Sequence, residues 1–178
     1  MRGRARRGFT LTELMVVVVI VGVLATLATY GIRKYILAAK ATEPIHMVGQ
    51  MKAAEESWFD EYRAYYNVST SLAPANAYPA APDNKKRNFK NPTHTDYAKW
   101  VNLNVNSNEP VQFGYAVQAG AASDTPPNPG TLQTFTWPST GEPWYVVKAV
   151  GDRNEDTVLC IVLGSSFTQE LYVENEQE

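Results

Sequence analysis

The longest apolar stretch of the chain runs from Leu14 to Ile32 and holds 19 residues without one charged side chain. A helix of that length is about 28 Å long, close to the roughly 30 Å hydrocarbon core of a bilayer. Arginine occupies four of the first seven positions, and nothing after the stretch is as basic. Because basic flanks stay on the cytoplasmic side, the pattern predicts one membrane-spanning helix, with a cytoplasmic N-terminus and everything after Ile32 exported.

Two other interpretations of this segment are open. A secretory signal peptide has a shorter apolar region of about 7–15 residues, with a small-x-small cleavage site directly after it. Here the nearest such site, at residues 39–41, lies beyond two further basic residues. A plain signal anchor would explain the arginines and the apolar stretch, but not Gly8, Phe9 and Glu13 between them.

Residues 33–66 follow a helical period. Apolar side chains recur at spacings of three and four, with charged side chains on much of the rest, and the apolar series is Met47, Met51, Ala54, Trp58, Tyr62 and Tyr65. This pattern predicts an amphipathic continuation of the first helix, with one face packed on a sheet. Pro44 interrupts the series, so we expect a kink there, and Thr42 is a candidate cap for the restarted helix.

Residues 67–110 are rich in Asn, Pro, Ala and Ser. A loop of this length is unusual in a compact domain unless it is functional or partly ordered. Within it, Tyr97–Leu103 has the pattern of one short amphipathic element that would hold the loop in place.

A basic group, formed by Lys85, Lys86, Arg87 and Lys90, lies inside this loop near aromatic residues. Cations interleaved with aromatic rings can bind single-stranded nucleic acid. The group is short, so a solvated surface is the favoured interpretation, with contact to an acidic neighbouring subunit or surface polymer as the alternative.

The C-terminal third predicts an antiparallel sheet of four to five strands, because segments rich in β-branched and aromatic residues alternate with clusters of Gly, Pro, Asp and Asn. A sheet needs a cover on its apolar face, and the amphipathic helix supplies it. The predicted fold class is therefore α+β, a long N-terminal helix packed on a C-terminal antiparallel sheet. The candidate strands are Val111–Gln118, Leu132–Trp137, Tyr145–Val150, Val158–Leu163 and Thr168–Val173.

Charge and cysteine content narrow the function classes. The chain has 16 basic and 18 acidic residues, a net charge of −2; without residues 1–8 and their four arginines, 12 basic and 18 acidic residues leave a net charge near −6. An acidic exported part argues against general nucleic-acid binding. The single cysteine, Cys160, cannot form an internal disulfide, and its apolar neighbours predict that it is buried.

Asp152, Asn154 and Asp156 alternate along one short segment. Alternating carboxylate and amide oxygens can converge on a calcium ion, although Thr157 and Leu163 stand where an EF-hand requires glycine and glutamate. A tight turn between two strands explains the same residues and is the favoured interpretation, since Asp and Asn favour turns. Calcium is thus the one candidate cofactor. No catalytic constellation emerges, and we do not expect an enzyme.

The residues ahead of the apolar stretch carry a resemblance to a known family. Arg7-Gly8-Phe9-Thr10-Leu11-Thr12-Glu13 resembles the end of the leader and the start of the first helix in type IV prepilins and type II secretion pseudopilins. The resemblance implies that a prepilin peptidase cleaves after Gly8 and methylates the new Phe9 amine. It also implies that Glu13, a carboxylate at the edge of a membrane segment, pairs with the Phe9 amine of a neighbouring subunit during assembly.

The same resemblance implies an order of segments and a function. A basic leader (1–8), a transmembrane and assembly helix (9–32), its amphipathic continuation (33–66), an αβ-loop (67–110) and a sheet domain (111–178) would follow one another. The expected function is a structural subunit of a type IV pilus, with a minor pilin as one variant. It would start in the bacterial inner membrane, with a periplasmic C-terminal domain, and reach the cell surface by assembly with other pilin subunits. A type II secretion pseudopilin and a non-polymerising, membrane-anchored periplasmic binding module are the alternatives.

Overall fold

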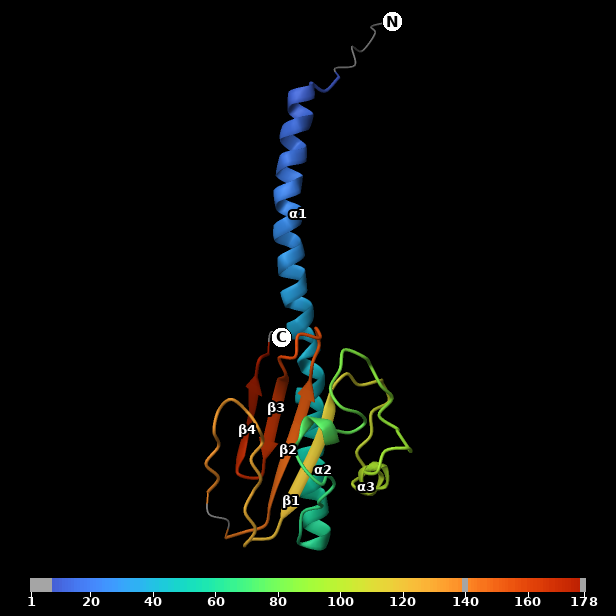
Figure 1. Ribbon diagram of the computed structural model, residues 1–178, viewed down its shortest axis with the longest axis vertical. Coiled ribbons are helices and arrows are strands. Elements are labelled where there is room, and N and C mark those ends of the chain that lie inside the picture. Colours follow the sequence, from blue (N-terminus) through green and yellow to red (C-terminus); the bar gives the residue numbers. More distant parts are fainter. Residues whose placement is uncertain (1–7, 139–140, 177–178) are drawn as a thin grey trace, which may run out of the picture. The chain divides into compact units, whose positions relative to one another are not determined.

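The computed structural model describes residues 8–138 and 141–176, so the leader arginines of residues 1–7 lie outside the described range. The chain divides into two compact units, Met1–Ile36 and Leu37–Glu178. Figure 1 shows the helices and strands along the chain. They are α1 (Leu11–Lys40), α2 (Thr42–Tyr62), the 3-10 helix η1 (Pro74–Asn76), α3 (Tyr97–Asn102), β1 (Gly114–Gly120), β2 (Trp144–Gly151), β3 (Cys160–Ser165) and β4 (Thr168–Glu174).

The N-terminal helix is interrupted at Ala41, between α1 and α2. Pro44 is the third residue of α2, in the first turn, where a backbone N–H has no partner within the helix. A proline ring clashes with the carbonyl group four residues earlier, here that of Lys40, so the predicted kink appears as a break three residues before Pro44. The expected cap at Thr42 is wrong, because Thr42 is the first helical residue and Ala41 holds the cap position without a side-chain hydrogen bond.

One face of α2 packs on the sheet, as the helical period predicted. Met47, Val48 and Met51 are buried in the core, and Trp58 packs against it. The helix approaches β3 closely at Gly164, where a Cβ would lie 2.9 Å from Cγ1 of Val48. Glycine at that position therefore lets the helix and the strand come together.

The end of α2 at Tyr62 lies four residues before the predicted end of the helix. Arg63 takes a left-handed conformation, with φ of 57°, and donates its N–H to the carbonyl of Phe59 at 2.8 Å, which closes the helix. The chain then turns back, and the ring of Tyr65 meets that of Tyr145 edge-on at 4.7 Å. Tyr65 thus reaches the core from the loop rather than from the helical stripe.

The four strands form one antiparallel sheet in chain order, in which each strand pairs with the next. This confirms the α+β class and four of the five predicted strands, with shifted bounds. The predicted strand Leu132–Trp137 is wrong, since this segment has no strand structure. β2 already pairs along its length with β1 on one side and β3 on the other, which leaves no free edge between them for an inserted strand.

The segment that is not a strand packs instead on the sheet face opposite α2. Phe135 and Trp137 join a small apolar cluster with residues of β1, β2 and β3. Side chains of the sheet bind the backbone of this loop: Nζ of Lys148 donates to the carbonyl of Pro129 at 2.5 Å, and Oε2 of Glu174 accepts the N–H of Leu132 at 2.9 Å. The loop therefore satisfies its backbone through side chains rather than through a strand ladder.

The αβ-loop lies beside β1 (Figure 1) and is ordered by pairing with it. Tyr78 forms an isolated bridge with Tyr115, and Arg87 forms another with Val111. The helix α3 confirms the predicted short element at residues 97–103, and its Trp100 is buried in the main core. The expected burial of Cys160 is confirmed as well.

Glu43, in the first turn of α2, ties the helix to the chain entering β1. Its Oε1 accepts the N–H of Gln112 at 2.8 Å, the N–H of Phe113 at 3.2 Å and the hydroxyl of Tyr115 at 3.1 Å. One carboxylate oxygen thus satisfies three donors from a segment about seventy residues away in the sequence.

Candidate functional site

From Leu14 to Ile32, α1 carries no charged side chain on any side. Leu11–Ile32, 22 residues, is long and apolar enough to cross a membrane, and at 1.5 Å per residue it spans roughly 33 Å. Its side chains are exposed within this chain. The hydroxyls of Thr26 and Thr29 donate to the carbonyls of Val23 and Ala25 at 2.7 and 2.8 Å, so these polar groups are satisfied inside the helix. A lipid or protein partner is then needed to remove the apolar surface from water.

A reciprocal cap between Thr10 and Glu13 begins this helix. The Thr10 hydroxyl accepts the Glu13 N–H at 3.2 Å, while Oε2 of Glu13 accepts the N–H and the hydroxyl of Thr10 at 2.8 and 2.7 Å. This arrangement is a capping box, which satisfies N–H groups that a helix start leaves unpaired. The sequence reasoning missed this role of Thr10, although the spacing Thr-x-x-Glu signals it.

The cap gives Glu13 a role within its own chain. It holds the carboxylate at the N-terminal edge of the apolar helix, where the helix dipole also favours a negative charge. The pairing of Glu13 with the Phe9 amine of a neighbouring subunit stays a prediction. A test of that pairing must separate the loss of the charge from the loss of the cap.

Gly8 and Phe9 lie just ahead of the helix, in residues without regular structure. A Cβ added at Gly8 would have no heavy atom within 4 Å, and Phe9 is 84% exposed. Packing within the chain therefore requires neither residue. Their roles in cleavage and methylation stay predictions, but a substitution at Gly8 can be interpreted without a change in the fold.

Asp152, Asn154 and Asp156 lie together in the turn between β2 and β3. The carboxylate of Asp152 accepts the N–H groups of Glu155 and Thr157 at 2.8 and 3.1 Å, and the amide of Asn154 donates to Asp156 at 2.9 Å. Glu155 and Thr157 have positive φ angles of 62° and 72°, which these hydrogen bonds help to hold. The contacts account for a turn, and calcium binding stays a prediction.

The basic group of the αβ-loop does not present its rings and cations on one surface. Phe89 is buried, with 2% of its surface exposed, whereas the following Lys90 is exposed. Arg87 forms an ion pair with Asp83. The Phe89 ring is therefore not available to stack with a base, which is what single-stranded nucleic-acid binding by interleaved aromatics needs.

The core contains a carboxylate, Glu55 of α2, whereas the helical period predicted charged side chains on the other side of the helix. It follows Met51 by four residues, and that spacing is the signal that could have placed it on the buried face. Oε2 of Glu55 accepts the N–H of Tyr66 at 2.8 Å, and Oε1 has no hydrogen-bond partner among the described residues. Burial raises the pKa of Glu55 to about 8, and the charge of Glu56 adds to this, so the carboxyl is protonated at neutral pH.

An apolar helix of membrane length with a capped start, followed by a helix packed on an antiparallel sheet, fits the class of membrane-anchored α+β proteins. Residues 3–29 match a family model described as the prokaryotic N-terminal methylation motif. "Fimbrial protein EcpC" of Eikenella corrodens is 31% identical over 58 residues, which cover 33% of this chain and 38% of that protein. Two proteins named "Fimbrial protein" from Pseudomonas aeruginosa are each 41% identical over 54 residues, which cover 30% of this chain and 35% of each of them. No solved structure matches.

The motif, the fimbrial relatives and the fold support the type IV pilin superfamily for this chain. The matched region spans little more than a third of the length of these curated relatives. The family-model match, residues 3–29, includes the capped start and most of the apolar part of α1.

Proposed function

We propose that the chain is a structural subunit of a type IV pilus, made as a prepilin and assembled through α1. The observation that carries the proposal is the N-terminal segment, in which a methylation motif leads directly into an apolar helix that nothing in its own unit covers. The inner membrane covers this surface before assembly, and the α1 helices of other subunits cover it in the filament. The same side chains are thus buried in both states.

The processing step follows from the same segment. A prepilin peptidase cleaves between Gly8 and Phe9 and methylates the new amine. The capped helix begins only after Thr10, which leaves the bond to be cut outside the helix. The leader arginines hold this end in the cytoplasm, and the α+β unit lies in the periplasm until the subunit is extracted into the filament.

The variants of this proposal differ in whether the chain joins a filament and in which filament it joins. A minor pilin would be rare in the pilus, and a type II secretion pseudopilin would share the motif, the cleavage and the fold. A membrane-anchored module that never polymerises would use the αβ-loop alone. The methylation motif and the fimbrial relatives favour a structural subunit of a filament over a catalytic protein.

The test combines the mass of the N-terminus with the recovery of filaments. In cells with an active prepilin peptidase, the mature chain should begin at a methylated Phe9, and Gly8→Val should block cleavage without unfolding the protein, because a side chain at Gly8 has open space. Gly31→Val is the matched control, since a Cβ at Gly31 also meets no heavy atom within 4 Å, and its cleavage should stay normal.

The outcomes separate the candidates. An intact N-terminus in these cells would refute the prepilin assignment. Recovery of the cleaved chain in sheared surface filaments supports the pilus subunit. Cleavage without recovery in surface filaments would instead favour the pseudopilin.

A further inference from the structure

The basic group of the αβ-loop turns positive charge outward from the α+β unit. Lys85, Lys86 and Lys90 are exposed and form no ion pair with any residue that the structure describes. Other cations of the unit donate to backbone carbonyls within it, among them Lys52, Lys99, Lys148 and Arg153. The lysines of the basic group are therefore available to a partner from outside.

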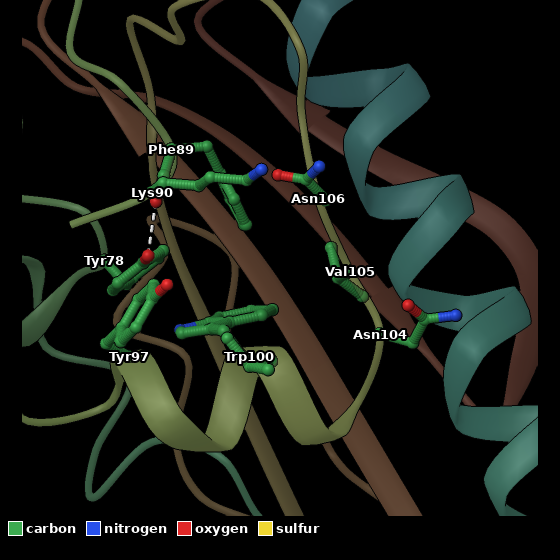
Figure 2. Close-up of a pocket in the computed structure, with 9 residues that line it drawn as sticks. Tyr78, Phe89, Lys90, Tyr97, Trp100, Asn104, Val105 and Asn106 are labelled. Carbon is green, nitrogen blue, oxygen red and sulfur yellow. Dashed lines mark hydrogen bonds between the residues drawn. The ribbon is translucent and has the colours of Figure 1, made fainter. Parts of the chain in front are cut away.

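The backbone holds the basic group in place. Arg87 pairs with Val111 in both directions, since its N–H donates at 2.7 Å and its carbonyl accepts at 2.8 Å. The carbonyl of Phe89 accepts the Tyr78 hydroxyl beside the pocket of the αβ-loop (Figure 2), which fixes the residue before Lys90. The lysine side chains thus extend from an ordered loop, so that their charge is preorganised for a partner.

The C-terminal end of α2 carries the opposite charge, against the local preference of a helix. Asp60 and Glu61 are exposed in its last turn, which contains no basic residue. Acidic side chains are unfavourable there, because the helix dipole already places negative charge at a C-terminus. Neither carboxylate forms an ion pair with a described residue, including Arg63, which caps the helix. An arrangement that breaks a local rule in this way is expected at a functional surface, where another molecule supplies the compensating charge.

The two charged surfaces lie at opposite ends of α2, so they cannot pair within one copy. Glu43, in the first turn of α2, accepts the N–H of Gln112, and the neighbouring Val111 pairs with Arg87 of the basic group. The basic group is therefore beside the start of the helix. Asp60 follows Glu43 by 17 positions, which at 1.5 Å per residue is about 26 Å along the axis. That exceeds the screening length of roughly 10 Å at 0.1 M salt.

Complementary charges at opposite ends of one unit fit a contact between copies of this chain. Each copy can offer its basic group to the α2 end of a second copy, and its own α2 end to a third. Such a head-to-tail contact is heterologous, and contacts of this type repeat into an open helical filament when they do not close a ring. An acidic polymer would also attract the lysines, but it would leave Asp60 and Glu61 without a compensating cation.

We propose that the basic group of one subunit binds the C-terminal end of α2, at Asp60 and Glu61, in the next subunit. The inference rests on the proposed function, because it assigns the partner of a filament subunit, but it concerns the α+β unit and not α1. Exposed ion pairs add little affinity. The contact therefore sets the register and orientation of neighbouring units, while burial of the apolar α1 surface drives assembly.

The experiment is an exchange of charges in the full chain, and the readout is the recovery of cleaved subunit in sheared filaments. Lys86→Glu and Glu61→Lys should each lower recovery at least tenfold, because each sets like charges against one another in the contact. The variant with both changes should return to within about twofold of wild type, because the pair is again of opposite sign. Normal cleavage and an unchanged melting temperature in each variant show that processing and the fold are intact.

The control combines Lys86→Glu with Glu170→Lys, at an exposed carboxylate of β4 that belongs to neither surface. It has the same net charge as the exchanged pair, and its recovery should stay as low as that of Lys86→Glu alone. Equal recovery of the two double variants would overturn the contact in favour of an effect of net charge. Wild-type recovery of Glu61→Lys beside a loss in Lys86→Glu would overturn it in favour of another anion, and wild-type recovery of both single variants would overturn it as well.

The contact and the proposed function fail in different ways. Absence of the wild-type chain from every filament would refute the filament subunit. The contact is then tested alone, with a short bis-maleimide and membranes that hold two differently tagged copies, one with Lys86→Cys and one with Glu61→Cys. A linked pair of the two tags supports the contact, and no linked pair overturns it. Because Cys160 is buried, the wild-type chain gives the background of this assay.

Discussion

Replacing Glu55 by glutamine tests whether ionisation of a core carboxyl controls the stability of the α+β unit. The Glu55 side chain has 0% of its surface exposed, and of its two oxygens only Oε2 has a described hydrogen-bond partner, the N–H of Tyr66. Glutamine keeps an oxygen that can accept this N–H, but it cannot ionise. We therefore expect Glu55→Gln to remove a pH dependence that the wild-type protein shows.

The size of the effect follows from the pKa values in the two states. The usual pKa of 4.5 applies to the unfolded chain, and burial raises the pKa of Glu55 to about 8 in the folded one. Between these values the folded state holds a proton that the unfolded state has released. The stabilisation is therefore complete below the unfolded pKa and is lost as the pH rises through the folded pKa, at up to 1.36 kcal/mol per pH unit and about 5 kcal/mol in all. For a chain of this size, that corresponds to a fall in melting temperature on the order of 10–20 °C.

The assay is thermal unfolding of the full chain in detergent, followed by circular dichroism between about pH 5 and pH 8. Wild type should lose stability over this range, whereas Glu55→Gln should stay nearly constant and be the more stable protein at the upper end. Glu56→Gln is the matched control, because Glu56 is the exposed neighbour whose Oε1 accepts the Tyr145 hydroxyl at 3.0 Å. It should keep a fall in stability with pH, displaced toward lower pH because the charge of Glu56 contributes to the raised pKa of Glu55. Parallel curves for wild type and Glu55→Gln would show that Glu55 does not ionise in the core, and the reasoning would fail.

Three other predictions concern assembly, packing and metal. Glu13→Gln keeps an acceptor for the capping box but removes the charge. If pairing with the Phe9 amine drives assembly, recovery of this variant in sheared filaments should fall as far as that of Glu13→Ala, while cleavage stays intact. Recovery of both variants at the wild-type level would refute the pairing mechanism. Glu43→Ala leaves three donors in and before β1 without their shared acceptor, so denaturant unfolding should show a free energy of unfolding lower by about 2–4 kcal/mol. A decrease under about 1 kcal/mol would contradict the role of Glu43 in joining α2 to β1. If Asp152, Asn154 and Asp156 share a calcium ion, a chelator should lower the melting temperature of the full chain, because calcium at a hundredfold excess over its dissociation constant stabilises the folded state by about 2.7 kcal/mol. The same melting temperature in chelator and in calcium would show that the segment is a turn without a bound ion.

The strands show which parts of the sheet a local sequence pattern can predict. Tyr145–Val150 lies within β2, and Thr168–Val173 lies within β4, because segments rich in β-branched and aromatic residues between turn signals favour strands. Leu132–Trp137 has the same β-prone composition and is not a strand. What separates the two cases is tertiary packing, because Phe135 and Trp137 pack on a face of the sheet instead of pairing with a strand.

The buried polar residues show a second limit. Glu55 lies on the apolar face of α2, as its spacing of four residues from Met51 indicates, but a charged residue type predicts a solvated position. Lys148 likewise lies in the middle of an apolar strand and is 1% exposed, with its ammonium group on the carbonyl of Pro129. Burial of such groups depends on a partner from a distant segment, and a pattern of neighbouring residues does not contain that information.

The sequence by itself determined the apolar helix, the methylation motif ahead of it and the break near Pro44, because length, hydropathy and the geometry of a proline are local properties. Only the tertiary structure decided that Glu43 joins α2 to β1, and that Tyr78, Lys90, Trp100 and Asn106 surround one pocket. These residues meet because helix, loop and sheet pack together as a whole. The distance between positions remote in the chain is set by that packing and not by any segment alone.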